Sequence, residues 1–149
     1  HGGIARDGAK FVHAVANANV PKFTVVFGGS FGAGNYAMAG RAFDPRLLFM
    51  WPNAKISVMG GEQAANVLIT VKEEQLKAKG QTLSTDERDR LYQSIIQKYN
   101  EEGSAYYSTS RLWDDGIIDP INTRKIIAMG IATALNKKEM DTKYGVFRM

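Results

Sequence analysis

The sequence contains no cysteine among its 149 residues. Without this residue the protein cannot form a disulfide scaffold, a thiolate zinc site or a cysteine nucleophile. Histidine is nearly as scarce, since only His1 and His13 are present, and a histidine-rich metal site is therefore excluded. The longest apolar runs reach about half the length that a membrane-spanning helix requires, so we expect no membrane partner.

The composition otherwise indicates one folded globular domain. Hydrophobic residues make up 44% of the chain and charged residues 23%, values that exclude wholesale disorder. The formal net charge of +4 is mild and no basic cluster accompanies it, so we expect no nucleic-acid partner. The chain opens on HGGIARDGAK, without an initiator methionine or a targeting pattern, and helical periodicity follows almost at once. This start predicts a piece of a longer protein.

Strand-like and helix-like segments alternate along the chain, which predicts an α/β fold with a layered sheet covered by helices. Ser84 and Glu87 have the spacing of a capping box. Runs of β-branched and aromatic residues predict strands at 23–27, 47–51 and 55–59, and a brief strand or extended link at 117–118. Helical spacing of apolar residues predicts helices at 4–19 with a stop in 17–21, at 35–40, 62–79, 105–112 and 123–136, and from the capping box to 102.

A glycine-rich turn, GGSFGAG at 28–34, follows the first strand and allows three interpretations. The first is a nucleophile elbow, because 28–32 fits G-x-S-x-G with Ser30 at its centre. That chemistry needs a histidine base later in the chain, and no histidine follows His13. The elbow is therefore disfavoured.

The second interpretation is a dinucleotide-binding turn, because 32–37 fits G-x-G-x-x-A. Such a turn needs an acidic residue at the end of the next strand to bind the ribose. Here that strand ends at Trp51 and is followed by Pro52, while Asp44 lies before it. A Rossmann-like oxidoreductase domain that binds a dinucleotide is kept as the alternative function, on weak support.

The third interpretation is an oxyanion hole. Unpaired amides at the start of a helix point outward and stabilise negative charge that develops on an oxygen, and glycine and alanine let that oxygen come close. A tight packing turn explains the same residues without any chemistry, so both explanations stay open. A second glycine corner, Gly60-Gly61, follows the strand at 55–59 and is expected to be structural. Two such corners in one small domain are similar to crotonase-type architecture.

Residues 28–68 resemble the carboxyltransferase (beta) subunits of methylcrotonyl-CoA carboxylases, which belong to the acyl-CoA carboxylase family. The likeness extends over essentially the whole chain. Met50-Trp51-Pro52-Asn53 and Met59-Gly60-Gly61-Glu62-Gln63 distinguish it from propionyl- and acetyl-CoA relatives. Further matching segments are 106–108, 112–120 and Gly145-Val146-Phe147-Arg148-Met149.

The resemblance implies a crotonase-like (ClpP/crotonase) α/β fold, with residues 1–149 forming part of the C-terminal carboxyltransferase domain. The implied reaction moves CO2 from carboxybiotin to 3-methylcrotonyl-CoA in leucine catabolism, as one component of an ATP-dependent ligase that forms C–C bonds. The half that binds CoA is expected upstream of His1, so this fragment alone is expected to be inactive. A crotonase-like module retained only for assembly is a further hypothesis.

The resemblance also implies site residues. Phe31, Gly32, Ala33 and Gly34 are similar to the family's biotin-side oxyanion hole, in which the amides of Ala33 and Gly34 hold the ureido oxygen as the N–CO2 bond breaks. The biotin anion can then take the γ-proton of the thioester, so that no side-chain base is needed. The two following residues, Asn35 and Tyr36, are expected to line the substrate pocket. No metal is expected.

The implied partners are an alpha subunit that carries biotin, other beta subunits in a hexamer-type core, and an acyl-CoA bound across a subunit interface. The implied compartment is the mitochondrial matrix in a eukaryote and the cytoplasm in a bacterium.

The charged helical segment 72–102 is either a solvated face or a contact surface for the biotin-bearing partner. The turn at 113–116 is expected to be structural, with Arg41 and Arg46 pairing with acids or meeting a partner subunit. His13 is expected to be an ordinary surface or boundary residue.

Overall fold

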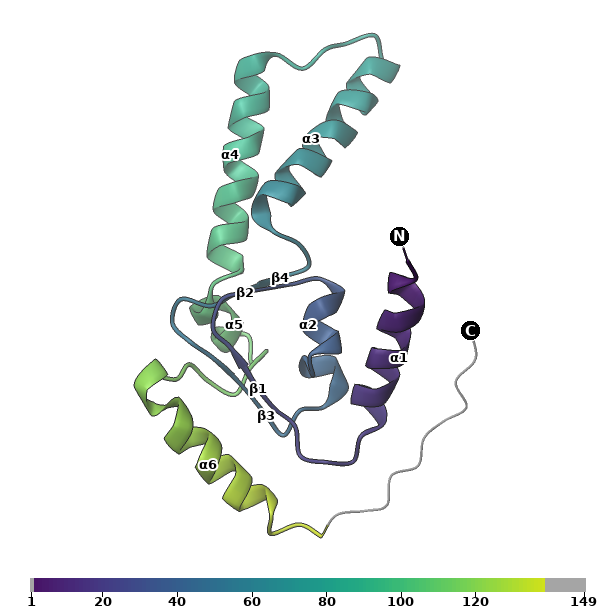
Figure 1. The fold of residues 1–149 in the computed structure, drawn as a ribbon. Helices are drawn as coiled ribbons and strands as arrows, with labels where there is room; N and C mark the ends of the chain where they lie inside the picture. Colours follow the sequence, from purple (N-terminus) through teal and green to yellow (C-terminus); the bar gives the residue numbers. More distant parts are fainter. Residues whose placement is uncertain (1, 139–149) are drawn as a thin grey trace.

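The computed structural model describes residues 2–138 (Figure 1). Strands and helices alternate through most of this range, as expected for an α/β fold. The strands are β1 (Phe23–Val26), β2 (Gly29–Phe31), β3 (Leu47–Met50) and β4 (Lys55–Ser57). The α-helices are α1 (Ile4–Asn17), α2 (Ala33–Ala37), α3 (Gly61–Ala78), α4 (Thr85–Glu102), α5 (Ala105–Ser110) and α6 (Thr123–Ala134). Two short 3-10 helices are η1 (Arg41–Phe43) and η2 (Pro120–Asn122).

The strands form two parallel pairs. β1 pairs with β3, from Phe23 opposite Leu47 to Val26 opposite Met50. β2 pairs with β4, with Gly29 opposite Lys55. The chain passes from the first pair to the second after β1 and again after β3, and α2 and η1 form the crossover that parallel pairing requires. The predicted layered α/β arrangement is therefore confirmed.

The core is centred on β3. Leu48 and Met50 are fully buried, and Val26 of β1 and Ala105 of α5 pack in the same cluster. α6 covers the β1–β3 pair at Gly130, where an added Cβ would lie only 2.9 Å from a ring carbon of Phe23. This close approach of helix to strand requires glycine.

Two side-chain contacts tie the outer helices to this core. The Trp51 indole N–H donates to the Thr123 hydroxyl at 2.9 Å, which fixes the start of α6 beside the end of β3. On the other side, α1 and α2 lie side by side (Figure 1). The Lys22 ammonium donates to the carbonyls of Val15 and Ala18 at the end of α1, so this helix stops where the sequence predicts.

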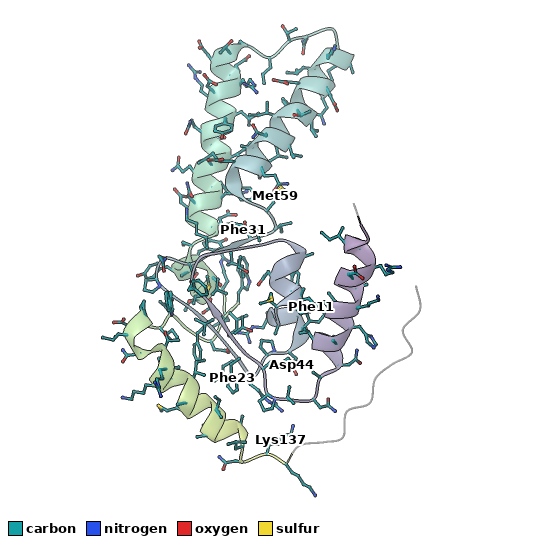
Figure 2. The ribbon with its side chains drawn as sticks, in the orientation of Figure 1. Phe11, Phe23, Phe31, Asp44, Met59 and Lys137 are labelled. Carbon is teal, nitrogen blue, oxygen red and sulfur yellow. The ribbon has the colours of Figure 1, made fainter. Side chains whose placement is uncertain are left out.

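Helices α3 and α4 form a hairpin that projects away from the strands (Figure 1). Its two helices pack through Ala64, Ala65 and Ile95, and Figure 2 places Phe31 and Met59 near its base. The predicted capping box is confirmed, because the Ser84 hydroxyl accepts from the Glu87 N–H at 3.3 Å and the Glu87 carboxylate accepts from the Ser84 N–H at 3.1 Å.

Some predicted boundaries are wrong. The expected turn at 28–34 contains strand β2, because the backbone of Gly29–Phe31 finds hydrogen-bonding partners in β4. Helix α2 starts at Ala33 instead of 35 and ends at Ala37 instead of 40, because the chain turns at Ala39 (φ 59°). The strand expected at 55–59 ends at Ser57. The prediction for 117–118, a brief strand or extended link, is confirmed by a bridge between Ile117 and Met50. Predictions that concern His1 and residues 145–149 lie outside the described range.

No helix within residues 2–138 is long and apolar enough to cross a membrane.

The clearest electrostatic feature of the hairpin is its capping box. Hydrogen bonds from the Ser84 hydroxyl and then from the Ser84 backbone N–H hold the pKa of the exposed Glu87 carboxyl below its ordinary value of 4.5.

We expect Ser84→Ala to lower the free energy of unfolding by about 1 kcal/mol at neutral pH, because an N-cap acceptor is lost. Because the pKa of Glu87 is lower in the folded state, its ionised carboxylate stabilises the fold at every pH above the pKa of the unfolded state. This stabilisation is lost as the pH falls through the pKa of the folded state. The difference between wild type and Glu87→Gln, measured by urea denaturation, should therefore shrink below about pH 4.5. A difference that does not change with pH would contradict the assignment.

Candidate functional site

The glycine turn adopts a backbone conformation that requires Gly32. This residue is the N-cap of α2, with φ 67° and ψ −151°, a region that L side chains rarely adopt. An added Cβ would also lie 3.2 Å from the Val58 carbonyl oxygen. The Gly32 N–H donates to the Ser57 carbonyl at 3.2 Å, and its own carbonyl accepts from the Asn35 N–H. The turn is thus held against the end of β4.

The next two amides are the first of helix α2 and have no carbonyl one turn earlier within the helix. They belong to Ala33 and Gly34, both of which are exposed. No atom lies within 4 Å of a Cβ built on Gly34, so there is open space beside this amide. The start of α2 therefore lies at the surface of the protein.

A cavity of about 800 Å³ adjoins this turn. Gly32, Ala33, Asn35 and Tyr36 form one part of its lining. The remainder comes from η1, β3, β4 and the segment after it, the end of α4, and the turn after α5. These residues are Arg41, Ala42, Leu48, Ile56, Ser57, Val58, Tyr99, Glu102, Gly103 and Trp113.

Four of the six predicted site residues therefore share one cavity. The other two, Phe31 and Gly34, flank its lining without being part of it. The ring of Phe31 instead lies over Gly29, where an added Cβ would be 2.6 Å from a ring carbon. Sequence reasoning missed Arg41 and Trp113 as cavity residues, because only the folded chain brings them to the turn.

Ser30 lies in the middle of β2, not at the sharp strand-to-helix turn that a nucleophile elbow requires. Its hydroxyl lies 3.0 Å from the Asn35 side-chain oxygen and donates to it. Ser30 therefore supports the orientation of Asn35, and the disfavoured elbow finds no support in the geometry.

The turn at 113–116 is structural, as predicted. The Asp114 carboxylate is 5% exposed and accepts three hydrogen bonds, from the hydroxyls of Ser108 (2.6 Å) and Thr109 (2.7 Å) and from the Gly116 N–H (3.0 Å). The neighbouring Asp115 carboxylate accepts from the Leu48 N–H at 2.7 Å and pairs with Arg41 at 3.2 Å. The prediction that Arg41 pairs with an acid is thereby confirmed.

The second glycine corner is also structural. Gly60 is the N-cap of α3 and Gly61 is its first residue. A Cβ on Gly61 would lie 3.1 Å from the Cβ of Tyr99, so glycine permits the close packing of α3 against α4. His13 contacts Asn17 one helical turn later, at 3.3 Å between ring nitrogen and side-chain amide, and lies away from the cavity lining.

Exposed amides at the start of a helix are compatible with an oxyanion hole, and comparison with known proteins identifies the family of the chain. A model of the carboxyl transferase domain family matches residues 1–147. The chain belongs to this family. The dinucleotide-binding alternative has no support from this match.

Several relatives of this carboxyl transferase domain are named as beta chains or beta subunits of acyl-CoA carboxylases. It is 59% identical over 147 residues to the probable mitochondrial methylcrotonoyl-CoA carboxylase beta chain of Drosophila melanogaster, covering 99% of this chain and 25% of the relative. It is 57% identical over 148 residues to the biotin-dependent 3-methylcrotonyl-coenzyme A carboxylase beta1 subunit of Mycobacterium tuberculosis, covering 99% and 28%. The domain thus spans about a quarter of the length of these relatives.

Solved structures confirm the crotonase-like fold. The domain superimposes on the beta subunit of geranyl-CoA carboxylase of P. aeruginosa with a TM-score of 0.79 and 41% identity, covering 99% of this chain and 28% of that one. It superimposes on the transcarboxylase 12S subunit with a TM-score of 0.78 and 30% identity, covering 99% and 26%.

We expect Asp114→Ala to lower the free energy of unfolding by about 3 kcal/mol, because the buried Ser108 hydroxyl and the Gly116 N–H lose their acceptor. Asp114→Asn is the matched control. It keeps one oxygen and the shape of the side chain, and should cost about 1 kcal/mol. Chemical denaturation of both variants measures the difference, and an alanine variant as stable as wild type would show that the turn does not depend on this carboxylate.

Proposed function

We propose that this domain is part of a biotin-dependent carboxyltransferase, within the second half of a beta subunit, and forms the side of the active site that holds biotin. The observation that carries the proposal is the pair of exposed amides of Ala33 and Gly34, which start α2 next to the large cavity. Family membership and the identity to beta chains of carboxylases support it.

The donor set suits a carbonyl oxygen that gains negative charge. Two backbone N–H groups point outward at a turn whose conformation Gly32 fixes, and the space beside Gly34 is free of side chains. Biotin, when bound, supplies the carboxyl group on a nitrogen of its ureido ring. The amides of Ala33 and Gly34 would hold the ureido oxygen and would stabilise negative charge on it.

The other cavity residues bind and orient the reacting groups. Asn35, held by the Ser30 hydroxyl, presents its side chain within the cavity lining, and Tyr36 provides an aromatic surface beside the acyl group. Tyr36 itself is fixed by an edge-on contact with Phe43, with ring centroids 6.4 Å apart. In this assignment the chain's own contribution to the chemistry comes from backbone N–H groups, with the side chains setting position.

We assign 3-methylcrotonyl-CoA as the substrate, and carboxyl transfer to it as a step of leucine catabolism. The support is the pattern of identity: 59% and 57% to two proteins named as methylcrotonyl-specific beta chains, against 35% to the methylmalonyl-CoA carboxyltransferase 12S subunit.

The proposed partners are an alpha subunit that carries biotin and further copies of the beta subunit. The transcarboxylase 12S relative is described as a hexamer, which supports a hexamer-type core. Apolar side chains such as Ile4 (87% exposed) and Ile121 (86%) suit burial by the rest of the subunit or by another copy. On the hairpin, α3 exposes Val67, Leu68 and Val71, which favours a contact surface over a purely solvated face.

The compartment follows from the source. Relatives from eukaryotes are named mitochondrial, so we assign the mitochondrial matrix to a eukaryotic protein and the cytoplasm to a bacterial one.

The decisive experiment is Ala33→Pro in the complete enzyme. Proline is well tolerated at the first position of a helix, so this change removes one N–H and leaves α2 in place. We expect kcat for carboxyl transfer to fall by about 100- to 1,000-fold, the usual effect of losing one oxyanion donor. The measurement is the steady-state rate of acyl-CoA carboxylation.

Ala33→Gly is the matched control, because it keeps the N–H and should retain most of the activity. Correct assembly of both variants is checked by size-exclusion chromatography. A correctly assembled Ala33→Pro enzyme with wild-type kcat would overturn the oxyanion assignment.

A further inference from the structure

Arg41 connects the two parts of the cavity that are farthest apart in the sequence. It is the first residue of η1, shortly after α2, and it lines the cavity. Its Nε donates to the carbonyl of Trp113, 72 residues further along the chain, at 3.0 Å. Its Nη2 lies 3.2 Å from the carboxylate of Asp115. One guanidinium group therefore holds the turn that follows α5.

That turn is already anchored on its other side. The Asp115 N–H donates to the Leu48 carbonyl at 2.7 Å, and the Asp115 carboxylate accepts from the Leu48 N–H at 2.7 Å. Leu48 is fully buried in β3. Arg41 thus bridges from the segment after α2 to a turn that is fixed to the core.

Trp113 is the residue of this turn that lines the cavity. Its ring packs edge-on against Tyr107, with centroids 5.7 Å apart, and the Arg111 guanidinium lies over that tyrosine ring at 4.9 Å. Tyr107 supports the ring of Trp113 and Arg41 supports its backbone. Because Trp113 is still 48% exposed, it is available to contact a ligand.

We propose that Arg41 is a positioning residue that fixes Trp113 as a wall of the cavity and thereby sets the affinity for the carboxyl donor. The inference rests on the proposed function. Arg41 does not touch the amides of Ala33 or Gly34; its two side-chain contacts are made with Trp113 and Asp115. Trp113 is expected to contact the substrate equally in the ground state and in the transition state. Loss of such a contact raises KM and leaves kcat nearly constant.

The test is the steady-state kinetics of the complete beta subunit, without the biotin-carrying alpha subunit, in the reverse direction, with free biotin as the variable acceptor of the carboxyl group of a carboxylated acyl-CoA. We expect Arg41→Gln to raise KM for biotin roughly tenfold, about the effect of one lost charge-assisted hydrogen bond, with little change in kcat. Arg41→Lys keeps a cation for Asp115 but cannot donate to two acceptors in a fork, so its KM should be intermediate. Arg46→Gln is the matched control. Arg46 lies five residues after Arg41 and carries the same charge, but it does not line the cavity.

A double-mutant cycle with Trp113→Ala separates positioning from a direct contact. If Arg41 acts through Trp113, the double variant should have the KM of Trp113→Ala alone. Melting temperature is measured in parallel, because a merely structural role would lower it and leave KM unchanged.

Three outcomes would overturn the inference. One is an unchanged KM in Arg41→Gln, and another is an additive rise of KM in the double variant. The third is a wild-type enzyme that uses no biotin, which overturns the proposed function as well. The first two leave the proposed function intact, so the two failures are distinguishable.

Discussion

The burial of β3 is the constraint on which the rest of the structure depends. Leu48 and Met50 are removed from water, and β1 pairs along one edge of the strand while Ile117 and the turn before it pair along the other. Asp115 binds both the N–H and the carbonyl of Leu48, so the turn is fixed by main chain and side chain together. Elements on both sides of the cavity therefore take their position from one buried strand.

The cavity arises because the two parallel pairs are coupled by short connections. Only two residues separate β1 from β2, and the end of β2 must lie beside the end of β4. This register places Gly32 against Ser57 and Val58, where an added Cβ would lie only 3.2 Å from the Val58 carbonyl oxygen. Helix α2 then starts directly after Gly32, whose φ is positive. The conformation of the turn is thus a consequence of strand pairing and one glycine.

The sequence was sufficient for those features that depend on neighbouring residues. The capping box of Ser84 and Glu87 was predictable because its four residues are contiguous, and so was the stop of α1 before Pro21. The short strand β2 was not predictable, because Gly29–Phe31 becomes extended only when β4 supplies its partners. The resemblance to a known family implied roles for Ala33 and Tyr36, whereas the places of Arg41 and Trp113 in the cavity depend on tertiary contacts that the sequence does not reveal.

A site built from backbone N–H groups responds to mutation differently from one built from ionisable side chains. A side-chain acid or base is lost by a single isosteric change, whereas an amide persists through every substitution except proline. The sensitivity therefore moves to the residue that fixes the backbone, namely Gly32, whose positive φ favours glycine. The absence of cysteine and the scarcity of histidine fit such a site, because the chemistry assigned to this chain requires neither. Side chains such as Arg41 and Trp113 are then left to determine what the cavity binds and how tightly.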